Sequence, residues 1–231
     1  MKTICKDNGN NTKGYFDKEY ADFNSSYEAG GNKNIKDFIR RASYFYNRKA
    51  IAGRLDALLG LAGEDVCGKR VLEVGCGPGF YSIRLAKEKL AKVTAIDYSS
   101  GMIRTAENNA RINGVNIDFI SADFLEHDFK DKFDYVFATG VIEYVEKRRR
   151  LDFIKKMTDL TERFVIVSFP KKHVLHALVR KLWLSLFKKI KISFFTSADI
   201  EKLSSLCGLK EKERRDVGIL WVIKFEKTQN E

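Results

Sequence analysis

The sequence predicts an α/β fold: a doubly wound, Rossmann-like sheet of seven mostly parallel strands with an antiparallel last strand. Short apolar runs rich in Val, Ile and Phe alternate with longer amphipathic stretches, as in a parallel sheet covered by helices. The first apolar run ends in a glycine-rich turn, as in nucleotide-binding α/β domains. Only Asp216-Val217-Gly218 separates the last two runs, and so short a connection can join only antiparallel strands.

The predicted elements begin near residue 70 and follow one another closely. Strands are expected at residues 70–74, 92–96, 117–121, 133–138, 164–169, 209–215 and 219–225. Helices are expected at 80–89, 99–113 and 196–207. Ser99 or Ser100 would cap the second of these helices, and Thr196 or Ser197 the third, because short hydroxyl side chains accept hydrogen bonds from the first turn.

The turn after the first strand has the pattern Glu-x-Gly-x-Gly-x-Gly, with glycines at 75, 77 and 79. Glycine lets the backbone approach a ligand closely because it has no Cβ. A dinucleotide fingerprint requires Gly-x-Gly-x-x-Gly, and Phe80 occupies its third glycine position. Asp97 ends the second strand 22 residues after Gly75, where an acidic side chain accepts hydrogen bonds from ribose hydroxyls. These residues predict a nucleoside-binding crevice.

This pattern resembles the first motif of class I S-adenosylmethionine-dependent methyltransferases, which implies the Rossmann-like methyltransferase fold and S-adenosylmethionine as cofactor. Glu73 suits a donor with an ammonium and a sulfonium better than it suits a pyrophosphate. The alternative is a glycine-rich turn in another kind of α/β protein. The resemblance implies a set of cofactor-binding residues: Tyr15, Glu73, Gly75, Cys76, Gly77, Gly79, Asp97, Tyr98, Met102, Asp123, Phe124, Thr139 and Gly140.

Two further segments contribute to the resemblance. Residues 121–124, Ser-Ala-Asp-Phe, look like the family's adenine-recognition motif, in which Asp123 accepts from the exocyclic amine and Phe124 packs on the ring. Residues 133–140 resemble the fourth-strand motif, so Thr139 and Gly140 are expected to face the donor and the acceptor. For both segments the alternative is an ordinary strand end and turn.

The segment after the fourth strand lacks the Asn/Asp-Pro-Pro-Tyr motif of base amine methylation and the Pro-Cys nucleophile of pyrimidine C5 methylation. Methyl transfer relies largely on positioning, and a base is needed only where the acceptor must lose a proton early. The candidate bases are His173, Glu143 and Tyr144, and none is singled out. His173 and His176 without a third ligand do not predict a metal site, and no metal is expected.

The chain of 231 residues is long enough for a single α/β domain. Residues 1–14 are predicted to be a flexible N-terminus, 15–68 a helical lid or cap, and 69–231 the methyltransferase domain. The lid is aromatic-rich, and Tyr15 either reaches over the donor or packs on the fold. The unpaired spacing of the four cysteines favours free thiols and a cytoplasmic location.

The formal charge of +11 is concentrated in residues 171–191, which hold seven Lys or Arg residues and no acid. Apolar residues recur there at helical spacing, so the segment reads as a basic amphipathic helix. Such a helix rests on an anionic membrane, covers the active site, receives an anionic or apolar substrate, or packs on the sheet with a solvated basic edge. A peripheral membrane contact is therefore one of four alternatives.

Three functions remain open on the sequence alone. The favoured one is O- or N-methylation of a small molecule, a hydrophobic or anionic metabolite. Residues 165–171 and 194–196 give a weaker similarity to magnesium-protoporphyrin O-methyltransferases. The second is an RNA methyltransferase, which a pI near 9.4 favours and the missing base-modification motifs oppose. The third is a non-catalytic S-adenosylmethionine-binding protein.

Overall fold

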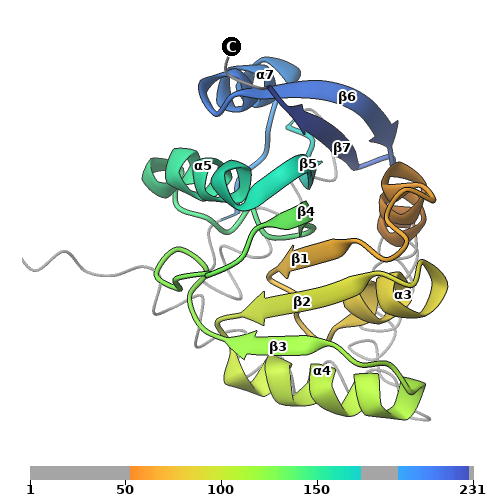
Figure 1. The fold of residues 1–231 in the computed structure, drawn as a ribbon. Helices are drawn as coiled ribbons and strands as arrows, with labels where there is room; N and C mark the ends of the chain where they lie inside the picture. Colours follow the sequence, from red (N-terminus) through yellow and green to blue (C-terminus); the bar gives the residue numbers. More distant parts are fainter. Residues whose placement is uncertain (1–52, 173–191, 229–231) are drawn as a thin grey trace, which may run out of the picture.

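A computed structural model describes residues 53–172 and 192–228 of the chain. They form a seven-stranded sheet in the order β3-β2-β1-β4-β5-β7-β6, with helices on both faces (Figure 1). The pairings β1–β2, β2–β3, β1–β4 and β4–β5 are parallel. Strand β7 is antiparallel to both β5 and β6. The predicted doubly wound sheet with an antiparallel last strand is confirmed.

The observed elements lie close to the predicted ones. The strands are β1 (Arg70–Val74), β2 (Lys92–Asp97), β3 (Asp118–Ser121), β4 (Phe133–Ala138), β5 (Thr161–Pro170), β6 (Leu209–Asp216) and β7 (Leu220–Lys227). The helices are α3 (Phe80–Glu88), α4 (Ser100–Asn113), η1 (Lys147–Arg149), α5 (Arg150–Leu160) and α7 (Ser197–Leu206), preceded by a helix at 53–62.

Strand β5 begins at Thr161, three residues before the predicted start at residue 164. The buried Thr161 pairs with Phe133 of β4, and its hydroxyl donates to the Phe164 carbonyl at 2.9 Å. The register shifts between Phe133 and Tyr135, so a β-bulge joins this first pair to the rest of the ladder. The apolar pattern alone did not include the polar residues that form this beginning.

The helix caps follow the predicted residue types. Ser99 caps α4, and its hydroxyl accepts from the backbone N–H of Met102 at 3.2 Å. Gly114 ends that helix in the left-handed conformation with φ of 66°. Thr196 caps α7 and forms a reciprocal capping box with Asp199. Of the paired alternatives in the sequence, the structure therefore selects Ser99 and Thr196.

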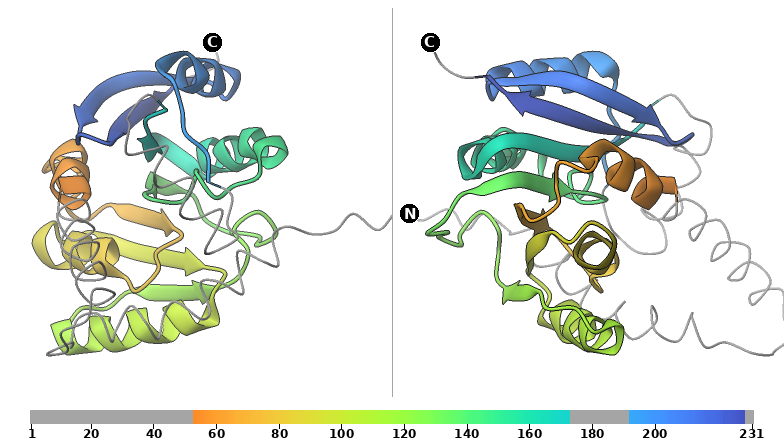
Figure 2. Two further views of the ribbon diagram at one scale, coloured as in Figure 1. Left: turned by 180° about the vertical axis from the view of Figure 1, so that it is seen from behind. Right: turned by 45° about the vertical axis from the view of Figure 1, so that its right-hand side comes forward.

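The sheet divides the core into two layers (Figures 1 and 2). The helix at 53–62, α3 and α4 pack on one face, and their apolar residues share a cluster with alternate residues of β1, β2 and β4. Helices α5 and α7 pack on the other face, against the intervening residues of the same strands. Because both faces are covered, the central strands are almost wholly apolar, and a buried charge among them is conspicuous.

The helix at 53–62 is held partly by the last hairpin of the sheet. The Lys224 ammonium of β7 donates to the Leu61 carbonyl at 2.9 Å. Gly53 lies against the turn between β6 and β7, and a Cβ added there would be 2.7 Å from Val217 Cγ1. These contacts join the beginning of the described chain to its end. They also fix the position of Arg54, which lies in the same helix.

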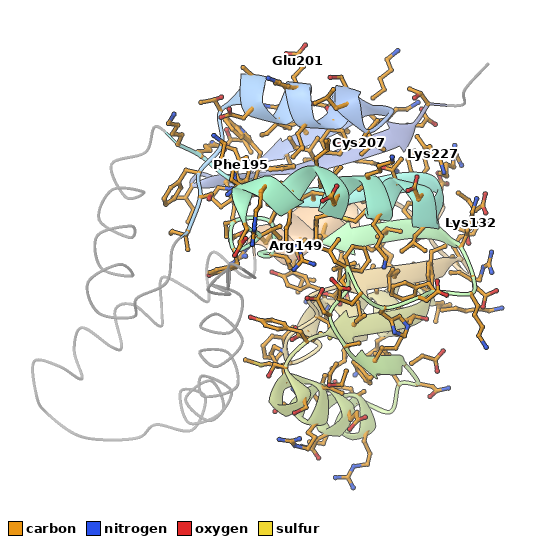
Figure 3. All side chains as sticks on the ribbon, turned by 90° about the vertical axis from the view of Figure 1, so that its left-hand side faces the viewer. Lys132, Arg149, Phe195, Glu201, Cys207 and Lys227 are labelled. Carbon is orange, nitrogen blue, oxygen red and sulfur yellow. The ribbon has the colours of Figure 1, made fainter. Side chains whose placement is uncertain are left out.

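Figure 3 separates the two ends of the sheet. Lys132 and Lys227 lie at one end, where β4 begins and β7 finishes, whereas Arg149 and Phe195 lie at the other. The carboxyl ends of the parallel strands meet at the Arg149 end, where α/β domains bind their ligands. Within 53–172 and 192–228, no helix is both long enough and apolar enough to span a bilayer.

Candidate functional site

The candidate site lies where the strand order reverses, between β1 and β4. β1 has β2 on one side and β4 on the other, so connections leave the two central strands in opposite directions. This arrangement opens a crevice above the carboxyl ends of the two central strands. The turns after β1, β2 and β4 all reach this edge, and they contain most of the predicted cofactor-binding residues.

The glycine turn after β1 is fastened to the end of β2. The N–H groups of Gly75 and Cys76 both donate to the Ile96 carbonyl, at 2.7 and 3.2 Å. Gly77 has a φ of 52°, and no atom lies within 4 Å of a Cβ built on it. Gly79 caps α3 with a φ of 81° and packs closely on Ala106 of α4. The turn thus presents bare backbone to open space at Gly77 and to a neighbouring helix at Gly79.

Asp97 ties the end of β2 to the glycine turn. Its Oδ2 accepts from the Gly77 N–H and its Oδ1 from the Ser99 N–H, both at 2.9 Å. The side chain is almost fully buried at 7% exposure. A carboxylate oxygen can accept more than one hydrogen bond, so these contacts leave Asp97 able to accept from a ligand hydroxyl as well. Asp97 both shapes the turn and belongs to the site.

Glu73 is a carboxyl group in the middle of the core, with 1% of its surface exposed. Its Oε2 accepts a hydrogen bond from the Ser82 hydroxyl of α3, whereas its Oε1 is buried with no hydrogen-bond partner among the described residues. Burial raises the pKa of Glu73 to about 8, against the opposing effect of Ser82. The same burial raises the pKa of the neighbouring Cys76 thiol. An unpartnered buried oxygen indicates a place for a hydrogen-bond donor from outside the protein.

Arg54 is a site residue that sequence reasoning missed. A Cβ added to Gly140 would be 2.6 Å from Arg54 Nη1, so the guanidinium lies directly over the turn after β4. Arg54 Nε is buried and has no partner among the described residues. No local motif marks this arginine, because only the packing of the helix at 53–62 on the sheet brings it to the crevice. Its position allows it to bind an anionic group.

Tyr81, the second residue of α3, was also missed. Burial is the main cause of its raised pKa; the Arg54 charge opposes this shift, and Glu73 and Glu143 reinforce it. The Thr139 hydroxyl, at the end of β4, lies beside the Tyr81 hydroxyl. The phenol therefore lies among charges from three parts of the chain. The sequence offered only an aromatic residue after a glycine turn, which is equally typical of core packing.

The turn after β4 places Thr139 and Gly140 at the crevice. The Gly140 N–H donates to the Ser168 hydroxyl of β5 at 2.8 Å, and its φ of 74° is one that glycine adopts freely. A Cβ on Gly75 would collide with the Val141 side chain, so the turns after β1 and β4 are in close contact. Because Gly75 and Gly140 have no side chain, the turn after β1 can lie against Val141 and the turn after β4 against Arg54.

Glu143 and Tyr144, two of the candidate bases, lie in the loop that follows. Glu143 is 3% exposed, and its Oε2 is buried without a partner among the described residues. Tyr144 is half-buried and packs with Ile192 and Phe194, from the segment that returns after β5. The third candidate, His173, lies outside the described residues.

Asp123 and Phe124 follow β3, as predicted, but their side chains differ in exposure. Asp123 is exposed, and its Oδ1 accepts from the Leu125 N–H at 2.8 Å. The Phe124 ring is buried, with its centroid 5.1 Å from that of Phe153 in α5. Because Phe124 belongs to the aromatic core, its contact with an adenine ring stays a prediction. Lys156 lies 5.5 Å from the same ring centroid.

The remaining predicted cofactor residues are Tyr98, Met102 and Tyr15. Tyr98 follows Asp97 directly and is half-buried. Met102, in the first turn of α4, is buried at 4% exposure. Tyr15 lies outside the described residues, as does most of the predicted lid. Among the residues that the structure describes, no group of three or more His, Cys, Asp or Glu side chains is arranged to hold a metal ion.

Comparison with known proteins agrees with this geometry. Residues 71–163 match a family model described as a methyltransferase domain. This match confirms the predicted resemblance to class I S-adenosylmethionine-dependent methyltransferases, and it covers the glycine turn, Asp97 and the turn after β4.

Individual relatives resemble the domain over different lengths. A chloroplastic magnesium protoporphyrin IX methyltransferase from Arabidopsis thaliana is 30% identical over 160 residues, 67% of this chain and 49% of that protein. A carboxy-S-adenosyl-L-methionine synthase from Nautilia profundicola is 30% identical over 124 residues, 53% of this chain and 51% of that protein. The chain thus spans about half the length of these curated relatives.

A solved structure shares the fold of the methyltransferase domain. Magnesium protoporphyrin IX methyltransferase from Synechocystis PCC 6803, with bound SAH, superimposes with a TM-score of 0.75 at 21% identity. The match covers 94% of this chain and 98% of the other. At that identity the likeness establishes the fold of the domain, and the chemistry of the site rests on the residues described above.

The residues of the methyltransferase domain fit a nucleoside that carries an amino acid. Gly77 leaves open space beside backbone, and the Asp97 carboxylate stands next to it. Glu73 Oε1 and Arg54 Nε are also buried without partners among the described residues, so the first can accept a hydrogen bond from a ligand and the second can donate one to it. An α-ammonium and an α-carboxylate supply the complementary groups.

Proposed function

We propose that the protein transfers a methyl group from S-adenosylmethionine to a small-molecule acceptor. The observation that carries this proposal is the presence of a ribose-type carboxylate, Asp97, a buried acid, Glu73, and a half-buried arginine, Arg54, beside the turns after β1 and β4. The methyltransferase domain match supports the same reaction class. The names of the relatives, which include a magnesium protoporphyrin IX methyltransferase, favour a small molecule as acceptor.

The donor would bind with its ribose at Asp97 and its amino acid between Glu73 and Arg54. Gly77 would let the donor approach the backbone, and Thr139 and Gly140 would lie beneath the reacting sulfur. The exposed Asp123, after β3, would accept from the exocyclic amine of the adenine, and Tyr98, after β2, and Met102, in α4, would contact the donor nearby. Tyr15 is proposed to cover the donor, as the sequence suggested.

S-adenosylmethionine, when bound, supplies a methyl group on a positively charged sulfur. The protein's contribution is then to hold the acceptor atom in line with that methyl group and to exclude water. The acceptor forms a bond to the methyl carbon, the carbon–sulfur bond breaks, and its electron pair stays on sulfur. An acceptor hydroxyl or amine also loses a proton, which a nearby side chain or solvent receives.

The acceptor would enter beside the loop after β4. Tyr144, Ile192 and Phe194 form a small apolar cluster there. Arg150 is held beside it: its Nε donates to the Val145 carbonyl at 3.1 Å, and it also bonds to Ser193. Burial lowers the pKa of Arg150. An apolar wall beside a partly buried cation suits a hydrophobic or anionic acceptor. Glu143, Tyr144 and His173 remain candidates for the proton acceptor.

The basic segment at 171–191 provides a second part of the proposal, a peripheral contact with an anionic membrane. Its seven basic residues, without an acid, alternate with apolar residues at helical spacing. Membrane contact would place the site near apolar acceptors dissolved in a bilayer. The proposal rests on the sequence, because residues 173–191 lie outside the described part of the chain.

The decisive experiment follows a labelled methyl group. Purified protein is incubated with methyl-labelled S-adenosylmethionine and an extract of the source organism, and label is measured in lipid, small-molecule, protein and RNA fractions. We expect label in the lipid or small-molecule fraction, and its loss with Asp97→Ala. Label in RNA or protein would mean that the acceptor is a macromolecule and not a small molecule. No label in any fraction, despite donor binding, would favour a non-catalytic donor-binding protein.

A further inference from the structure

Glu143, one of the candidate bases, is a buried carboxyl group with an unpartnered oxygen. Glu143 lies in the loop after β4, five residues beyond the end of that strand at Ala138. Only 3% of its surface is exposed, and its Oε2 has no hydrogen-bond partner among the described residues. A buried, unpartnered carboxyl oxygen is costly to the fold, because nothing replaces the water that it has lost. A ligand group that donates a hydrogen bond would remove this cost.

The position of Glu143 is fixed by its backbone. The Glu143 carbonyl accepts from the Ser193 N–H at 3.0 Å, which joins the loop after β4 to the segment that returns after β5. Nearby, the Tyr144 N–H donates to the Val141 carbonyl at 2.9 Å and closes a tight turn. Backbone hydrogen bonds therefore hold the loop around Glu143. They fix the position from which its buried side chain extends.

Glu143 belongs to the same group of charges as Glu73 and Arg54. All three act on the Tyr81 hydroxyl, the two acids raising its pKa and the arginine lowering it. They come from separate parts of the fold: the loop after β4, strand β1 and the helix at 53–62. Tyr81, on α3, is the common neighbour. The contacts between the turns agree with this grouping, because Gly75, two residues beyond Glu73, lies against Val141, and Gly140 lies against Arg54. Two carboxyl groups and one guanidinium therefore lie near one phenol.

The charges of this group match the amino-acid end of the donor only when Glu143 is included. That end carries one carboxylate, which Arg54 can bind, and one ammonium beside a cationic sulfur. Glu73 supplies one free oxygen, because Ser82 occupies the other. An ammonium has three hydrogen-bond donors, so one free carboxyl oxygen leaves two of them without a charged acceptor. A second carboxylate supplies what is missing.

We propose that Glu143 is a donor-binding residue that accepts a hydrogen bond from the α-ammonium of S-adenosylmethionine, together with Glu73. The inference rests on the proposed function, since it concerns the donor of that reaction. It assigns Glu143 to the donor and removes it from the candidate bases. The proton of the acceptor is then received by another group.

The test compares two ligands that share the nucleoside and differ in the amino-acid part, which carries the α-ammonium. S-adenosylhomocysteine carries the complete amino acid, whereas 5′-methylthioadenosine keeps the nucleoside and the sulfur without it. The affinity of each is measured by calorimetry for the full chain, for Glu143→Gln and for the control Glu146→Gln. Glu146 lies three residues further along the same loop, and its carboxylate pairs with Arg148 at 2.7 Å.

We expect Glu143→Gln to lower the affinity for S-adenosylhomocysteine by about ten-fold or more, as for loss of a hydrogen bond between charged groups. Its affinity for 5′-methylthioadenosine should stay within about two-fold of the parent value, and Glu146→Gln should change neither. Equal losses for both ligands would show that Glu143 only supports the fold, which overturns the proposal.

Two other results are separable. Unchanged affinity of Glu143→Gln for S-adenosylhomocysteine, with or without loss of methyl transfer, would also overturn the proposal, because the residue would then serve the acceptor or nothing at the site. Failure of the parent protein to bind S-adenosylhomocysteine at all would contradict the proposed function itself. The parent measurement therefore distinguishes failure of the further inference from failure of the function on which it rests.

Discussion

The Asp97 carboxylate accepts a hydrogen bond from the backbone N–H of Gly77 at 2.9 Å. This bond holds the open glycine of the first turn beside the acid that is proposed to bind ribose. Its other oxygen accepts from the Ser99 N–H, so one side chain connects the turn after β1 to the beginning of α4. The geometry of the turn and the affinity for the donor are therefore coupled through Asp97.

Asp97→Ala is expected to lower the affinity for S-adenosylhomocysteine by about ten-fold or more, because charge-assisted hydrogen bonds contribute about 1.5 to 3 kcal/mol each. Asp97→Asn keeps one acceptor oxygen and should lose less. Calorimetry gives both affinities, and circular dichroism establishes that each variant is folded. A folded Asp97→Ala protein with the parent affinity would place the ribose elsewhere.

Gly140→Ala tests the position of Arg54. The added Cβ would lie 2.6 Å from Arg54 Nη1, so the guanidinium must move away from the turn after β4. We expect about a ten-fold loss of affinity for S-adenosylhomocysteine, from the weakened pairing with its carboxylate. Thermal unfolding should also show a loss of roughly 1 to 3 kcal/mol, because φ is 74° and alanine is strained there.

The matched control for this variant is Gly114→Ala. Gly114 ends α4 with a φ of 66°, and no atom lies within 4 Å of a Cβ built on it. It shares the backbone strain of Gly140 without the collision, so stability should fall similarly while the affinity stays unchanged. Equal losses of affinity in the two variants would mean that strain, and not Arg54, explains the Gly140 result.

Donor affinity should depend on pH through Glu73. Burial raises the pKa of Glu73 from 4.5 to about 8, so the unliganded protein holds this carboxyl group protonated at neutral pH. An ammonium favours the ionised form, and binding therefore releases a proton. The dissociation constant of S-adenosylhomocysteine should fall as pH rises towards 8, by up to about ten-fold per pH unit. Calorimetry at pH 6, 7 and 8 measures this trend, which Glu73→Gln should abolish.

The raised pKa of Glu73 also makes the stability of the unliganded protein depend on pH: donor affinity rises with pH, whereas stability falls. Because the folded pKa of Glu73 lies above the unfolded value, its contribution to the free energy of unfolding is fully present below pH 4.5 and is lost as pH rises towards 8. Denaturant unfolding of the parent and of Glu73→Gln across this range isolates the contribution of Glu73. A pH-independent difference between the two proteins would contradict the raised pKa.

Exchange of Lys188, Lys189 and Lys191 for Ser tests the proposed membrane contact. Each basic residue near an anionic surface contributes about 1 kcal/mol, so binding to phosphatidylglycerol vesicles should weaken at least about ten-fold. A control variant exchanges three exposed lysines outside this segment: Lys92, which begins β2, and Lys130 and Lys132, which precede β4. Co-sedimentation measures all three proteins, and absence of vesicle binding by the parent would exclude the contact.

Much of the fold was predictable because its signals are local. The apolar runs at β1 and β4 match the observed strands residue for residue, since buried parallel strands consist of short continuous apolar segments. The glycine turn and Asp97 were also predictable, because each is recognised by residue type and spacing. The antiparallel direction of the last strand followed from the short final connection and from the resemblance to a known family.

The rest of the site depends on contacts between distant segments. Arg54 reaches the turn at Gly140 only because its helix packs on the sheet, and no spacing in the sequence records that contact. Similarly, the sequence did not predict that the Phe124 ring packs beside Phe153, and the contact of Phe124 with an adenine ring stays a prediction. An aromatic residue after a strand suits either role, and packing against α5, absent from the sequence pattern, decides which neighbours it has.

The contacts of Lys224 with Leu61 and of Val217 with Gly53 bear on the order in which the protein is assembled. Domains begin to fold while synthesis continues, from the N-terminus onward. The ribosome makes β7 after every other strand of the sheet. The helix that carries Arg54 can therefore make these contacts only after residues more than 150 positions further along the chain have been synthesised. We therefore expect a nascent chain that stops before β6 to hold the ribose carboxylate near its turn, yet to lack the capacity to retain the donor.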